Sequence, residues 1–83
     1  MKVELKYTFG CKDGFKYTRD TFKEIKEVVD KNYEELRSMC KAGDSLNMTM
    51  DYTNEYFPKA DISAYINGTW KYYSLRTEVT ELI

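Results

Sequence analysis

Histidine is absent from the 83-residue chain, which also has only two cysteines, one proline and four glycines. Without histidine, the commonest general base is missing, and so are the Ser–His and Cys–His pairs of nucleophilic catalysis. The glycines do not form a phosphate-binding loop, because each falls at an expected turn or helix end. The sequence therefore predicts a non-enzymatic protein with no catalytic residue. A paired-carboxylate enzyme is the alternative, since such pairs often meet only in the fold.

The two cysteines, Cys11 and Cys40, form no Cys-x-x-Cys pair. In a reducing compartment we expect two free thiols. A structural disulfide, or a Cys11 that links two copies, is the alternative. Because a structural zinc site normally takes four ligands, two thiols without histidine predict no metal site, and we expect no cofactor.

Long apolar runs are also missing. Charged residues interrupt the N-terminal stretch MKVELKYTFG, so it does not have the form of a signal peptide, and no later stretch is apolar enough to span a membrane. We therefore expect a cytoplasmic protein with no membrane partner. The formal net charge of −1 lies far from the basic excess typical of nucleic-acid-binding domains.

What the chain does contain is a clear succession of periodic segments. Alternating apolar and polar residues predict strands over 3–9, 15–17, 46–52, 59–66 and 69 to about 78. Between the second and third strands, apolar residues at three- and four-residue spacing predict one amphipathic helix from Phe22 to about Cys40. The order ββαβββ predicts a single α+β domain over residues 1–83, with an antiparallel sheet and one amphipathic helix packed on one face.

Local signals refine three of these elements. Thr21 followed by Glu24 is a capping box at the start of the helix, and Gly43 is expected to supply the left-handed residue after its last turn. Residues 10–14 are expected to form a loop between the first two strands. In the third strand, Met48 and Met50 share a face that we expect to fill the core under the helix; a methionine-rich, adaptable binding surface is the alternative.

The stretch YINGTWKYY, residues 65–73, predicts a hairpin, because Asn-Gly between two β-forming runs is typical of a two-residue turn. Across that turn Tyr65 faces Trp70, and Ser63 faces Tyr72, so the aromatic residues share one face. The opposite face carries the residues suited to contact with the helix: Ile62, Ala64, Ile66, Tyr73 and Leu75.

An aromatic cluster on an otherwise polar sheet face indicates a binding site. The predicted partner-binding residues are Tyr65, Trp70, Tyr72 and Arg76. Two alternatives stay open: the C-terminal tail, residues 79–83, folds over this face, or the chain forms a homodimer through it. A further candidate is an acidic docking face on the helix around Asp30, Glu34 and Glu35, for which a solvated surface is the simpler interpretation.

The charges on the aromatic face favour a protein partner. Five cationic residues on that face (Lys2, Lys6, Lys16, Lys59 and Arg76) stand against four anionic ones (Glu4, Asp51, Asp61 and Glu78). Single-stranded nucleic acid would require stacking aromatics together with a clear positive field. A nucleic-acid-binding regulator that uses the same aromatic face is therefore the second hypothesis.

In overall character, the whole chain resembles the small proteins that phages and mobile elements encode against bacterial defence systems, anti-CRISPR inhibitors above all. The resemblance lies in short length, a single α+β domain, abundant Tyr, Lys, Glu and Asn, and no catalytic constellation. It implies stoichiometric inhibition of a larger nuclease or nucleoprotein complex in the host cytoplasm. That group shares no sequence motif, so the resemblance assigns no role to any residue.

Overall fold

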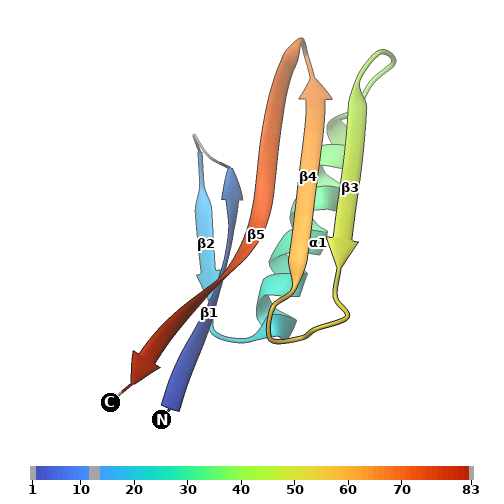
Figure 1. Ribbon diagram of the computed structural model, residues 1–83. Coiled ribbons are helices and arrows are strands. Elements are labelled where there is room, and N and C mark those ends of the chain that lie inside the picture. Colours follow the sequence, from blue (N-terminus) through green and yellow to red (C-terminus); the bar gives the residue numbers. More distant parts are fainter. Residues whose placement is uncertain (1, 12–13, 83) are drawn as a thin grey trace.

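The computed structural model describes residues 2–11 and 14–82 and has the element order ββαβββ (Figure 1). The elements are β1 (Lys2–Cys11), β2 (Lys16–Arg19), α1 (Phe22–Met39), β3 (Ser45–Asp51), β4 (Lys59–Ile66) and β5 (Thr69–Leu82). The α+β class, with one helix on one face of an antiparallel sheet, is confirmed. Lys12 and Asp13 of the predicted loop, and Ile83 of the tail, lie outside the described residues.

The sheet has the strand order β2-β1-β5-β4-β3, so the C-terminal strand lies at its centre. Each half of β5 has a different set of neighbours. Residues 69–75 pair with β4, and residues 73–82 pair with β1. As a result the β4–β5 hairpin extends past β1 at one end, and a β1–β5 ribbon extends past β4 at the other (Figure 1). This stagger gives the molecule its length, with extents of 52 × 25 × 15 Å.

The strand predicted to end near Glu78 continues to Leu82, where the paired residue is Lys2. The extension has a physical cause: residues 2–5 of β1 pair with residues 79–82 and supply backbone hydrogen-bond partners for the tail. The tail is therefore a strand of the sheet, and its described residues do not fold back over the aromatic face.

Helix α1 begins where the capping box predicts. The Glu24 backbone N–H donates to Thr21 Oγ1 at 3.2 Å, and the Thr21 hydroxyl donates to Glu24 Oε1 at 2.8 Å. The predicted role of Gly43 is wrong, because the chain leaves the helix at Cys40 in an extended conformation. Gly43, with φ +91°, instead lies in a turn closed by the Asp44 N–H and the Lys41 carbonyl at 3.0 Å.

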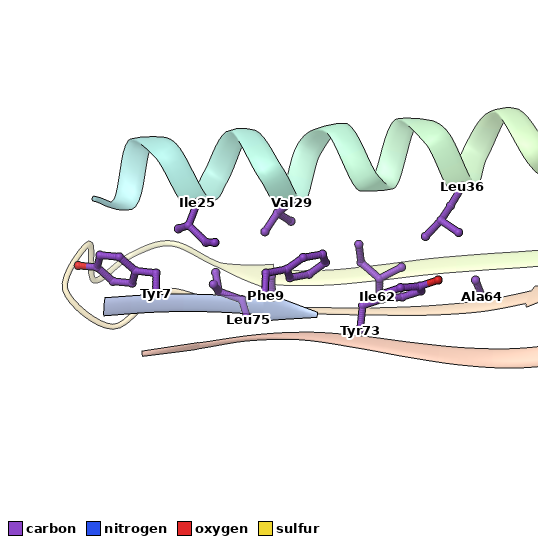
Figure 2. Close-up of a cluster of buried hydrophobic side chains, with 10 residues drawn as sticks. Tyr7, Phe9, Ile25, Val29, Leu36, Ile62, Ala64, Tyr73 and Leu75 are labelled. Atoms are coloured by element: carbon purple, nitrogen blue, oxygen red, sulfur yellow. The ribbon is translucent and has the colours of Figure 1, made fainter. Parts of the chain in front are cut away.

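The core lies between α1 and the inner face of the sheet, the face turned toward the helix. Figure 2 shows Ile25, Val29 and Leu36 pointing from the helix toward the strands. The buried apolar residues are Tyr7, Phe9, Ile25, Val29, Leu36, Ala60, Ile62, Ala64, Tyr73 and Leu75. The small side chains of Ala60 and Ala64 leave room for the helix above β4. Met48 packs against this core, but Met50 is 55% exposed, so the prediction for Met50 is wrong. Its strand, β3, lies at one edge of the sheet.

Candidate protein-binding face

The hairpin that carries the candidate site has the turn and register that the sequence predicts. Asn67 and Gly68 both have positive φ, 54° and 79°, the geometry of a two-residue turn that matches the twist of its strands. Tyr65 pairs with Trp70, and Ser63 pairs with Tyr72. The turn is also tied to the beginning of β3, since the Asn67 N–H donates to Asp44 Oδ1 at 3.4 Å.

Three aromatic rings lie together on the outer face of this hairpin, the face turned away from α1. We call Tyr65, Trp70 and Tyr72 the outer aromatic cluster. The ring centroids of Tyr65 and Trp70 are 5.1 Å apart, and those of Trp70 and Tyr72 are 6.0 Å apart with an angle of only 9° between the rings. Trp70 is 49% exposed and Tyr72 62% exposed. The cluster is thus pre-arranged by its own ring contacts and presents a broad apolar surface.

Most of the residues that register places next to the cluster are polar and uncharged; the exception is the anionic Asp61, which pairs with Ser74. Register places Ser45 and Asn47 of β3 beyond Tyr65 and Ser63 of β4, and Ser74 follows Tyr72 by two residues along β5. These hydroxyl and amide groups can donate and accept hydrogen bonds without the desolvation penalty of a charge. An aromatic centre with a polar rim is the usual composition of a protein interface.

Arg76, the fourth predicted site residue, lies on the same face but apart from the rings. It pairs with Thr8 of β1 and follows Tyr72 by four residues, which along a strand is about 13 Å. Between the two residues the outer face has a hollow lined by Thr8, Gly10, Cys11, Lys16, Tyr72, Ser74, Arg76 and Glu78. Arg76 therefore shares a hollow with Tyr72 and does not belong to the aromatic cluster.

Sequence reasoning did not find this hollow. It exists because Gly10 pairs with Ser74, so two small residues lie side by side between larger ones. Gly10 is required there, since a Cβ would lie 2.2 Å from the Phe15 carbonyl oxygen. The pairing of β1 with β5 joins opposite ends of the chain, and no local pattern reveals it.

A second recess, also missed, lies on the inner side of the same hairpin. It is lined mostly by apolar groups of α1, β4 and β5, among them Leu36, Ile66 and Tyr73, and the polar Asn32 and Lys71 line it too. Within the described residues, β1 ends opposite Tyr73. Residues 69–72 of β5 therefore have β4 as their only neighbouring strand there. At this end of the hairpin, Trp70 on the outer face and Lys71 on the inner face are both exposed.

On the inner side of the sheet, burial changes the pKa values of three tyrosines. Burial raises the pKa of Tyr73, with a smaller contribution from Cys11. Burial likewise raises the pKa of Tyr52, helped by Asp30, and that of Tyr7, helped by Tyr56 and Glu55. Each of these phenols therefore stays neutral to a higher pH than a free tyrosine does.

Three further observations bear on the chemistry of the chain. Cys11 and Cys40 are free, half-buried thiols. Across residues 2–11 and 14–82, no group of three or more Cys, Asp or Glu side chains is placed to hold a metal ion. No helix in that same part of the chain has the length and apolar character needed to cross a membrane.

Comparison with protein-family models, curated proteins and solved structures gives no match.

Proposed function

We propose that this chain is a non-enzymatic protein-binding module and that the outer aromatic cluster is the centre of its interface. The observation that carries the proposal is the exposure of a stacked Trp–Tyr pair on a sheet face that α1 does not cover. Central tryptophan and tyrosine residues dominate the binding energy of many protein interfaces. Because the rings already contact one another, little side-chain entropy is lost when a partner covers them.

The charge distribution favours a protein over a nucleic acid as the partner. Register places four neutral residues and one anionic residue next to the cluster: Ser45, Asn47, Ser63, Ser74 and Asp61. A strand of nucleic acid stacked on the rings would need cations beside them to bind its phosphates. The cations Lys16 and Arg76 line the hollow beside Tyr72, but the anionic Glu78 lines the same hollow.

For the partner we propose a bacterial defence nuclease or nucleoprotein complex, which this chain would inhibit stoichiometrically in the host cytoplasm, as a phage-type inhibitor. The proposed identity of the partner is supported by the overall resemblance of the chain to anti-CRISPR-like proteins. The cluster offers a means of inhibition without catalysis, since binding alone can occlude a larger enzyme.

The experiment is affinity capture of the tagged protein from a bacterial lysate, followed by mass spectrometry and an activity assay of the captured protein. We expect a nuclease or nucleoprotein subunit to be retained by the wild type, lost with Trp70→Ala, and kept with Tyr56→Ala. Tyr56 is the matched control because it is 68% exposed but lies in the loop before β4. Titration of the purified partner should show complete inhibition at equimolar ratio.

A salt series distinguishes the nucleic-acid hypothesis. Binding to phosphates weakens steeply as salt is added, because counterions are released, whereas aromatic docking to a protein changes little. Binding of a single-stranded oligonucleotide at low salt that disappears at moderate salt, together with no captured protein, would contradict the proposal and support the regulator. Turnover of a substrate that is abolished by a carboxylate substitution, in a variant that still folds, would contradict the non-enzymatic part.

A further inference from the structure

The two outer strands of the sheet differ in how well they resist pairing with another chain. At one edge, β2 has only four residues, of which Lys16 and Arg19 are charged. At the other edge, β3 pairs with β4 residue for residue from Ser45 to Asp51, without a bulge. Residues 45–50 of β3 contain no charge, proline or glycine. Proteins normally protect such an edge, because its free backbone groups are a template for another strand.

The register determines which backbone groups of β3 are free. A two-residue hairpin is closed by a hydrogen-bonded pair, here Ile66 and Thr69, and hydrogen-bonded pairs then alternate along the ladder. Tyr65 therefore directs its N–H and C=O toward β3, where its partner is Ser45. By the same alternation, the N–H and C=O groups of Leu46, Met48 and Met50 point away from β4. Among the described residues, no strand lies beyond them.

We propose that β3 pairs with β3 of a second copy of this chain, antiparallel and about a two-fold axis at Met48. In this register Met48 lies opposite Met48 of the second copy, and Leu46 lies opposite Met50 of the second copy. All the outward-directed backbone groups of these residues then find partners. The resulting interface is isologous, and it joins two five-stranded sheets into one.

The side chains support a second copy as the occupant, because the strand is complementary to its own reverse. On the inner face, the apolar Leu46 meets the apolar Met50, which is 55% exposed in the single chain. On the outer face, Asn47 meets Thr49 and Ser45 meets Asp51, so no like charges lie opposite one another. Methionine side chains adapt readily to such a contact. The outer aromatic cluster lies on β4 and β5 and stays exposed in this dimer.

The first test is the mass in solution, measured by sedimentation equilibrium over a concentration series. The wild type should reach twice the monomer mass of 9.9 kDa at high concentration. Met50→Lys should stay monomeric, because two buried lysines would oppose the strand contact, whereas Val79→Lys should dimerise normally. Val79 is the matched control, since it is 53% exposed and lies on β5. Trp70→Ala should also dimerise normally.

Circular dichroism should show both lysine variants folded, because both side chains replace exposed residues. A wild type that is monomeric at every concentration would overturn the proposal. So would a dimer that survives Met50→Lys, a dimer that is lost with Trp70→Ala, or assembly that continues beyond two copies.

The second test uses the predicted cross-pairing of Ser45 with Asp51, two exposed residues of the outer face. Hydrogen bonds from the Thr53 hydroxyl at 2.6 Å and the Thr53 N–H at 3.1 Å lower the pKa of Asp51, so it is ionised near neutral pH. Ser45→Lys should tighten the dimer roughly two- to tenfold through two symmetric ion pairs, and Ser45→Glu should weaken it by a similar factor. Equal dimer affinities for the two variants would contradict this register.

Discussion

Both faces of the β4–β5 hairpin carry aromatic side chains, but these side chains differ in how far they are buried. On the inner face, Ile62, Ala64 and Tyr73 are at most 5% exposed and contact the helix side of the core. On the outer face, Trp70 and Tyr72 are 49% and 62% exposed. Residues that alternate along one strand thus have two environments: one set is buried in the core, and the other stays exposed on the outer face. The following predictions separate the two sets.

The largest effect should come from the inner side. Ile25 is fully buried and Leu36 is 6% exposed, both between α1 and the sheet (Figure 2). Ile25→Ala and Leu36→Ala should each lower the free energy of unfolding by about 2–5 kcal/mol, because each leaves a cavity that the small core cannot refill. Chemical denaturation measures this difference. If either variant unfolds at the wild-type midpoint, the helix does not cover the sheet as described.

An intermediate effect is expected at the turn that fixes the register of the hairpin. Gly68 has φ +79°, which an alanine adopts at a cost of about 1–2 kcal/mol. No atom lies within 4 Å of the position of an added Cβ, so strain of the backbone is the only penalty. Gly68→Ala should therefore lower stability by that amount. Gly14→Ala is the control, since its added Cβ makes an ordinary 3.4 Å contact with Cys11, and it should change stability little.

On the outer face, truncation should hardly affect folding. Trp70→Ala should change the free energy of unfolding by less than about 1 kcal/mol, as for other substitutions of exposed residues. A loss of about 3–5 kcal/mol would mean that the indole is buried and that the cluster belongs to the core. Because Trp70 is the only tryptophan, its fluorescence gives an independent check. The emission maximum should be that of a water-exposed indole, and a strong blue shift would contradict the exposed site.

The smallest effect concerns the tyrosines of the inner side at high pH. Burial raises the pKa of Tyr52, and its hydroxyl has no hydrogen-bond partner among the described residues. Because the pKa is higher in the folded chain, the neutral phenol contributes to the free energy of unfolding. This contribution is complete below the unfolded pKa of about 10 and is lost as the pH rises through the folded pKa. Tyrosine absorbance is followed against pH for the wild type and for Tyr52→Phe, and the second curve is subtracted from the first. The difference, which belongs to Tyr52, should have its midpoint above pH 10. A midpoint at or below the ordinary value would contradict its burial.

Much of the hairpin site follows from local sequence. The Asn67-Gly68 turn fixes which residues of β4 and β5 are opposite one another, and strict alternation then assigns each side chain to a face. The same logic places Thr21 and Glu24 at the start of α1, because capping is a contact between near neighbours in sequence. These features need no knowledge of the rest of the fold.

The remaining features depend on contacts between distant segments. The pairing of β1 with the second half of β5 decides that the C-terminal tail is a strand, that Gly10 and Ser74 form a hollow, and that Arg76 lies beyond it. Grouping Arg76 with the rings rested on their shared face alone, which carries no information about distance along the strand. The open edge of β3 likewise follows from strand order, which the sequence does not specify.

The measurement that tests the central claim most directly is the affinity of the captured partner for two alanine variants, determined by calorimetry beside the wild type. Trp70→Ala should weaken binding by about 2 kcal/mol or more, roughly 30-fold, as expected for a central interface tryptophan, while its unfolding stays close to that of the wild type. Tyr56→Ala, which removes a more exposed ring in the loop before β4, should bind like the wild type. Equal affinities for Trp70→Ala and the wild type would contradict the outer aromatic cluster as the binding site.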